Sequence, residues 1–112
     1  MRLTPATVLV LGSALGGCSL TLPVQGHVAA TGETFTGRAT GYADGAGDLM
    51  IISNKGVRCT GAFVYVSRRQ GDGTFVCDDG RTGPFTFVST GQRGTGSGRL
   101  GGEPFTFIFG AI

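Results

Sequence analysis

Glycine is spaced through this chain between short runs of phenylalanine, valine, threonine and isoleucine, and this spacing restricts the fold more than any other feature. The chain has 22 glycines, eight phenylalanines and no tryptophan. Glycine-rich chains can be disordered, but here the glycines separate apolar runs and do not form a uniform polar tract. After Cys18 no window places apolar residues at the spacing of a helix. The sequence therefore predicts an all-β domain of short strands and tight turns.

The apolar runs follow one another at the spacing of hairpins. Asn, Asp and Gly lie between them at residues 43–45 and 54–56, and these residues tolerate the positive φ that hairpin turns require. We therefore expect an antiparallel meander of about six to eight short strands, as a curved sheet or as a small barrel or sandwich. The clearest runs are residues 35–42, 48–53, 60–65, 84–88 and 104–109.

A short unit of the form Gly-x-Gly-x-apolar occurs three times, at residues 45–49, 71–75 and 96–100. Each copy is followed by a turn and then by a strand rich in aromatic residues. Over about residues 35–109 the pattern resembles the membrane occupation and recognition nexus (MORN) repeat, in which each unit is a β-hairpin. The resemblance implies hairpin repeats with a period of about 25 residues. It implies no particular function.

Period-two alternation assigns the aromatic side chains to one face of the predicted sheet. We expect this face to be buried, and Gly61 to leave room on it for a ring to lie across the backbone. The opposite face carries Thr86, Val88, Thr106 and Ile108 and is expected to remain accessible. The side chains assigned to the buried face are Cys59, Phe63, Tyr65, Phe75, Cys77, Phe85, Phe87, Phe105, Phe107 and Phe109.

Cys59 and Cys77 lie on either side of a predicted hairpin tip at residues 67–71, and the midpoint between them is residue 68. Antiparallel pairing places them opposite each other or one diagonal step apart. An even pair of cysteines in an exported chain favours a disulfide. A metal site is the competing interpretation, but two cysteines without nearby histidines fall short of tetrahedral zinc ligation. We therefore expect a disulfide, and neither a metal nor a cofactor.

The N-terminal segment has the organisation of an export signal. Arg2 provides positive charge, and residues 6–15 are apolar but too few for a membrane-spanning helix, which needs roughly 20. The motif Leu-Gly-Gly-Cys at residues 15–18 resembles the lipobox of bacterial lipoproteins. The resemblance implies that residues 1–17 are a helical signal peptide that is removed and that Cys18 receives the lipid. An ordinary secretory signal that ends near a cysteine is the alternative.

The same resemblance implies a location and a division of the chain. A lipidated protein would be held in the cell envelope through its acyl chains, and Ser19 after the lipidated cysteine goes with sorting to the outer membrane. We expect residues 18–32 to form a tether from the lipid, with residues 24–29 as a candidate first edge strand. Residues 33–112 then form a single glycine-rich β domain.

Charge and motifs exclude several function classes. Removal of Arg2 with the signal leaves eight of the nine basic side chains against seven acidic ones, so nothing favours nucleic acid as a partner. Residues 96–101 spell G-x-G-x-x-G, but a strand follows where a dinucleotide site needs a helix. The Asp-Gly pairs at residues 72–73 and 79–80 are explained by turn chemistry and lack the calcium-binding repeat.

No catalytic constellation is visible. His27 is the single histidine and lies in the predicted tether, so no nucleophile–histidine pair is expected. Asp78 and Asp79 are adjacent, and on a strand they would point to opposite faces, which prevents a carboxylate pair. The sequence therefore predicts a protein that is not an enzyme.

Two functions from different classes fit these observations. The first is a lipid-anchored envelope protein whose β domain presents a surface to a protein, glycan or cell-wall partner, or serves a structural role. The second is a lipid-anchored inhibitor of an exported hydrolase, such as a lysozyme or a protease. Its inhibitory loop would be the basic hairpin tip formed by Arg68, Arg69, Gln70 and Gly71.

Overall fold

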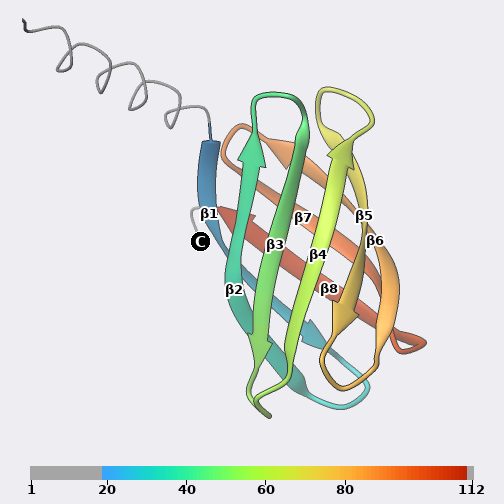
Figure 1. Cartoon of the computed structure of the whole chain (residues 1–112). Helices are drawn as coiled ribbons and strands as arrows, with labels where there is room; N and C mark the ends of the chain where they lie inside the picture. The colour runs from blue at the N-terminus through green and yellow to red at the C-terminus, as the bar shows by residue number, and fades with distance from the viewer. Residues whose placement is uncertain (1–18, 111–112) are drawn as a thin grey trace, which may run out of the picture.

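The computed structural model describes residues 19–110, which form eight β-strands joined by short connections. Figure 1 shows the strands wrapping around one another in chain order. They are β1 (Ser19–Val28), β2 (Glu33–Tyr42), β3 (Ala46–Ser53), β4 (Arg58–Tyr65), β5 (Gln70–Cys77), β6 (Thr82–Thr90), β7 (Arg93–Leu100) and β8 (Glu103–Gly110).

Each strand pairs antiparallel with the next one in the sequence, and β8 pairs back with β1, so the sheet closes into a barrel. The prediction of an all-β antiparallel meander is confirmed, and of the three forms that it allowed the structure takes the barrel. No helix of the described part of the chain is long and apolar enough to cross a membrane. The predicted signal segment and Cys18 lie outside the described residues.

The first strand corrects the predicted boundary of the domain. Residues 18–32 were expected to be a tether with a candidate edge strand at residues 24–29, but the strand is longer, Ser19–Val28, and it is not an edge, because it pairs with both β2 and β8. Leu22, Val24 and Val28 alternate toward the interior, and the two valines are buried. Their burial, together with the ladder to β8, stabilises this segment as part of the wall. The barrel therefore begins at Ser19 and not near Glu33.

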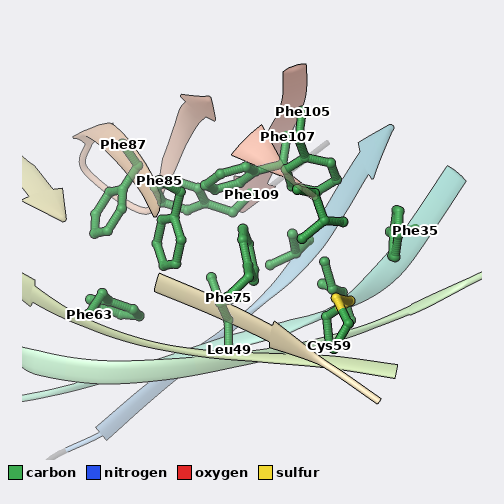
Figure 2. Packing of buried hydrophobic residues seen from close by; sticks show 14 of the residues in the cluster. Phe35, Leu49, Cys59, Phe63, Phe75, Phe85, Phe87, Phe105, Phe107 and Phe109 are labelled. Atoms are coloured by element: carbon green, nitrogen blue, oxygen red, sulfur yellow. A yellow bond between two sulfur atoms is a disulfide. The ribbon is translucent and has the colours of Figure 1, made fainter. Parts of the chain in front are cut away.

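The interior is filled by aromatic rings in edge-to-face, tilted and stacked contacts, as Figure 2 shows. Phe75 lies near the centre, and its ring centroid is 5.4 Å from that of Phe105 and 4.3 Å from that of Phe85. Such pairs are worth about 0.5–1.5 kcal/mol beyond the area that they bury. The predicted buried face is confirmed for all its members except Tyr65, which points inward at the end of β4 but is 37% exposed.

Glycines on one strand make room for phenylalanine rings on the next. Gly96 of β7 is registered between Phe87 of β6 and Phe107 of β8, and a Cβ atom placed on it would overlap the Phe107 ring. Gly73 of β5 likewise lies between Phe63 and Phe85. An eight-stranded barrel has an interior just wide enough for side chains, so large residues on every strand would not fit. The glycine spacing of the sequence is therefore the packing pattern of the barrel.

The β4–β5 hairpin carries the disulfide. Cys59 and Cys77 are directly opposite in the register, are joined by a disulfide and lie on the buried face, as predicted. Gly61, one inward position further along β4, lies against the rings of Phe75 and Phe85, as expected. The tip of this hairpin is residues 66–69.

Candidate functional site

The two ends of the barrel are built differently. At the upper end in Figure 1, which we call the mouth, the wall is completed by the start of β1 and by connections 43–45, 66–69 and 91–92. At the lower end, the closed end, lie connections 29–32, 54–57, 78–81 and 101–102. Phe35, Ile51 and Leu100 fill the interior near the closed end and are almost completely buried.

An ion pair covers the closed end. The Arg81 guanidinium donates two hydrogen bonds to the carboxylate of Glu33, at 2.7 and 3.0 Å, and lies 6.0 Å from the centre of the Phe35 ring. The Glu33 side chain is only 3% exposed. The hydrogen bonds from Arg81 hold the pKa of the Glu33 carboxyl below its usual value, although burial opposes this shift.

A second carboxylate supports the same arginine. Arg81 Nε donates to Asp79 Oδ2 at 2.8 Å, and the Arg81 backbone N–H donates to Asp79 Oδ1 at 3.1 Å. The hydrogen bond from this backbone N–H is the main reason that the pKa of Asp79 is lowered. The hydrogen bonds that Arg81 donates to Glu33 in turn raise the pKa of Arg81, so the guanidinium stays charged. The ion pairs of Arg81 with Glu33 and Asp79 therefore join the start of β2 to the 78–81 connection at this end.

The mouth contains an apolar pocket of about 420 Å³. Ligand pockets in proteins are commonly roughly 300–1,000 Å³, and the mouths of β-barrels are frequent places for them. Leu49, Phe63, Phe87, Phe107 and Phe109 are its buried lining. The remaining lining residues lie toward the solvent and are Ser19, Leu20, Leu22, Ala39, Gly41, Tyr42, Ala43, Tyr65 and Gly91.

The pocket lies where β1 extends past β8. Val24 is the first residue of β1 with a partner in β8, which is Phe109, whereas Ser19–Pro23 pair only with β2 among the described residues. Figure 1 shows the start of β1 beyond the end of β8. Leu20 and Leu22 therefore face the pocket from a single overhanging strand. Where β1 and β8 are paired, side chains fill the interior. Between this paired region and the mouth, the interior is open and forms the pocket.

Tyr65 lies over one side of this opening and is held there by polar contacts. Its hydroxyl donates to Ser89 Oγ at 3.2 Å, and Ser89 Oγ donates to the carbonyl of Arg69 at 3.3 Å. The backbone N–H of Ser89 donates to the same carbonyl at 2.7 Å. The Tyr65 ring also packs edge-to-face on Phe87. The 66–69 connection and the end of β6 are thus fixed to each other beside the pocket.

Only two of the four residues predicted to form the basic hairpin tip lie in the turn. Arg68 and Arg69 are exposed in the turn, where Ser67 Oγ accepts hydrogen bonds from the N–H groups of Arg69 and Gln70. Gln70 and Gly71 belong to β5, and Gly71 is buried beneath the Phe87 ring. Gly71 is therefore a packing residue and not part of an accessible loop. The structure places the two arginines at the mouth, next to Tyr65.

Neither Glu33 nor the pocket was assigned a role from the sequence. Glu33 was expected only to begin the domain, although period-two alternation with Phe35 would have placed its carboxylate on the buried face. A carboxylate at such a position requires a cationic partner, and the turn at residues 78–81 supplies Arg81. The pocket depends on Leu20 and Leu22, which the sequence interpretation had assigned to a tether.

Among the described residues, His27 lies on the outer face of β1, 3.5 Å from the hydroxyl of Thr106, and is not in the pocket. The described residues contain no group of three or more His, Cys, Asp or Glu side chains arranged to hold a metal ion. The predicted lipidation residue, Cys18, is outside the described part and immediately precedes β1.

Comparisons with known proteins support the architecture. No protein-family model matches the chain. A search of curated proteins found no match either. Among solved structures, the chain is similar to a de novo designed fluorescence-activating β-barrel, with a TM-score of 0.63 and 14% identity over 82% of this chain and 91% of that one. At this identity the likeness shows the fold alone, and the fold is a closed barrel of eight antiparallel strands.

Proposed function

We propose that this protein is a non-enzymatic, lipid-anchored protein of the bacterial cell envelope whose barrel binds a small apolar molecule in its mouth. The observation that carries the proposal is the pocket of about 420 Å³ between the aromatic core and the overhanging start of β1. The partner is therefore a small molecule held inside the wall, whereas the sequence alone suggested a partner docked on an outer surface.

The chemistry of the lining defines the ligand class. Rings of Phe63, Phe87, Phe107 and Phe109 and the side chain of Leu49 offer apolar contact deep in the pocket. Burial of apolar ligand surface against them is worth roughly 25 cal/mol per Å² before the entropic costs of binding. Ser19, Tyr42 and Tyr65, which carry hydroxyl groups, belong to the solvent-exposed part of the lining. The ligand is therefore a mainly apolar molecule with a polar group at the end that faces water.

Cell-envelope placement rests on the N-terminal motif and agrees with the polarity of the barrel. The outward positions are rich in threonine and include charged residues in mid-strand, such as Arg38, Asp48 and Asp72, all of them exposed. A barrel that crosses a membrane has an apolar outer band. The outer wall of this barrel is suited to water, and the lipid expected on Cys18 would supply membrane affinity. Ser19 at the following position supports the outer membrane.

A dye titration tests the proposal. The designed barrel that this chain resembles is described as fluorescence-activating, a property of that protein, and this makes environment-sensitive apolar dyes reasonable first probes. We expect a dye to gain fluorescence on addition of the Cys18→Ser protein and to saturate at one site. Gly41→Phe should abolish this gain, because a side chain at Gly41 enters the pocket and meets no atom within 4 Å of its Cβ.

The matched control is Ala62→Phe, which adds a ring to the exposed outer face of β4. It should leave the dye titration unchanged. If Gly41→Phe binds the dye as well as Ala62→Phe does, the mouth pocket is not the binding site and the proposal fails.

One observation keeps the inhibitor function as a second candidate. The 66–69 turn is exposed and preorganised by Ser67 Oγ and by the Ser89–Arg69 hydrogen bonds, as a loop inserted into an enzyme cleft should be. Residual activity of a lysozyme and of a secreted protease, measured with wild type and with Arg68→Glu/Arg69→Glu, tests this candidate. Loss of inhibition in the variant would favour it, and no inhibition by wild type would exclude both enzymes as targets.

A further inference from the structure

We propose that the mouth of the barrel lies against an anionic phospholipid bilayer, so that the pocket opens directly onto the lipid. The inference rests on the proposed function, because the lipid on Cys18 is what holds the barrel at a membrane. It adds the orientation of the barrel and the chemistry of the surface that it contacts. Three independent features of the mouth support it.

The first feature is exposed apolar surface. Leu20 at the start of β1 is 46% exposed, Tyr42 at the end of β2 is 47% exposed, and Val66 in the β4–β5 turn is 56% exposed. Tyr65 lies beside them. Near the closed end, the exposed large hydrophobic side chains among the described residues are only Ile52 and Val76, each one residue inside the end of its strand, and the four connections carry none. Tyrosine and aliphatic side chains together are typical of surfaces that sit at the boundary between headgroups and acyl chains.

The second feature is charge. Arg68 and Arg69 in one connection of the mouth and Arg93 at the start of β7 are exposed, and Asp44 is the single acidic residue in the three connections there. In the connections of the closed end, two basic residues are balanced by two acidic ones, and Arg81 is already bound to Asp79 and Glu33. A basic side chain near an anionic membrane contributes about 1 kcal/mol, which is roughly a fivefold gain in binding. The mouth is thus complementary to anionic headgroups.

The third feature is the attachment point. Ser19 is the first residue of β1 and lines the pocket, and the residue before it is Cys18. One residue of chain spans at most about 3.6 Å, so acyl chains on Cys18 leave no spacer between the bilayer and the pocket. The closed end is the length of an eight-residue strand away, about 26 Å along its axis. An apolar ligand could then pass from the bilayer into the pocket without crossing water.

The absence of tryptophan from the sequence allows a direct test. The acylated protein is reconstituted into phosphatidylglycerol vesicles whose acyl chains carry bromine, which quenches tryptophan fluorescence at short range. Gln92→Trp places the reporter in the 91–92 connection of the mouth, and Lys55→Trp is the matched reporter in the 54–57 connection of the closed end. Both positions are exposed. We expect strong quenching and a blue shift for Gln92→Trp and neither change for Lys55→Trp.

A second measurement isolates the contribution of charge. When Arg68→Glu/Arg69→Glu is added to the Gln92→Trp protein, most of the quenching should be lost. The Gln92→Trp protein with both arginines intact should also lose most of its quenching at high ionic strength, which screens exposed charges. Lys55→Glu is the matched charge reversal at the closed end and should have no effect. Thermal melts verify that each variant is folded.

Equal quenching of the two reporters, quenching of neither, or quenching of Lys55→Trp alone would overturn the orientation. Quenching of Gln92→Trp that survives both charge reversal and high salt would overturn the role of the anionic headgroups. The dye titration uses the Cys18→Ser protein without vesicles. Failure of pocket binding is therefore distinguished from failure of membrane docking.

Discussion

Arg81 binds Glu33 through both of its terminal nitrogens, at 2.7 and 3.0 Å, across 48 residues of sequence. The pair joins the start of β2 to the β5–β6 connection, on the other side of the barrel. It therefore acts as a noncovalent crosslink over the end of the interior. A ladder of strands cannot provide this contact, because each strand reaches only its two neighbours.

This crosslink should make stability depend on pH. The folded-state pKa of Glu33 is lowered, chiefly by the Arg81 hydrogen bonds, so the stabilisation is complete above the unfolded pKa of about 4.5 and is lost as pH falls through the lower folded value. Asp79 shifts in the same direction. Thermal melts between pH 7 and pH 2 should show a loss of stability in acid that is smaller in Glu33→Gln. The same acid loss in wild type and Glu33→Gln would contradict this assignment.

Arg81→Met should lower the free energy of unfolding more than Glu33→Gln does. Arg81→Met leaves a buried carboxylate without a cation, and we expect it to lower the free energy of unfolding by about 1–3 kcal/mol at pH 7, less than a fully buried pair because Arg81 is partly exposed. Arg99→Met is the control, because Arg99 is exposed and bonds only to a nearby carbonyl. Equal unfolding midpoints for the two variants would show that the crosslink contributes little.

The glycines that face phenylalanine rings should not tolerate even a methyl group. A Cβ atom on Gly71 would overlap the Phe87 ring, whereas one on Gly41 meets nothing within 4 Å. Gly71→Ala should therefore destabilise the barrel by about 1–3 kcal/mol through overpacking, or roughly 4–24 °C in a thermal melt. Gly41→Ala should be close to neutral. If both changes were neutral, the ring–glycine contact would not be a packing constraint.

The two faces of β8 should respond very differently to truncation. Phe107 is 3% exposed and contacts several other rings, so Phe107→Ala should cost about 3–5 kcal/mol. Thr106 is exposed on the outer wall, and Thr106→Ala should stay within about 0.5 kcal/mol. Chemical denaturation of the two variants provides the comparison, and similar losses would contradict the assignment of the faces.

The disulfide should be a large part of the stability of this small domain. It closes a loop with a sequence separation of 18 residues, and the chain-entropy model assigns such a loop about 3 kcal/mol. Cys59→Ser/Cys77→Ser should lower the unfolding midpoint while the strand signal in circular dichroism at low temperature is retained. Two titratable thiols in protein purified without reductant would refute this expectation.

Lipidation at Cys18 remains a prediction from the sequence motif. Cys18→Ser should leave an unprocessed or water-soluble form, since two or more acyl chains, at about 0.8 kcal/mol per buried CH₂, provide durable membrane affinity. Partitioning between a detergent phase and water measures the difference. Equal partitioning of wild type and variant would end this interpretation.

Local patterns in the sequence were sufficient for most of the strands and for their faces. The alternation Phe85-Thr-Phe87 and the turn residues between the runs depend on near neighbours. The symmetric placement of Cys59 and Cys77 about residue 68 predicted that they are opposite or one diagonal step apart, and the structure has them directly opposite. These features depend on contacts within one hairpin. The strands and their faces could therefore be predicted without knowledge of the rest of the fold.

Closure and the pocket could not be predicted in this way. The pairing of Val24 with Phe109 joins the first strand of the barrel to the last, and no periodicity in either strand specifies the other. The short apolar pattern of β1, interrupted by Pro23 and Gly26, is compatible with a tether until β8 is present to cover it. The pocket follows from the offset between these two strands and was missed for that reason.

The neighbour-to-neighbour order of the strands has a consequence for biosynthesis. Seven of the eight strand pairs join consecutive segments, so each hairpin can pair soon after it is synthesised. The eighth pair must wait, because β1 is made first and its partner, Glu103–Gly110, is made last. Until that strand arrives, β1 and β7 are unpaired edges that can recruit other chains. A chain that ends before Glu103–Gly110 is made would therefore be an open, aggregation-prone sheet with an almost complete set of hairpins.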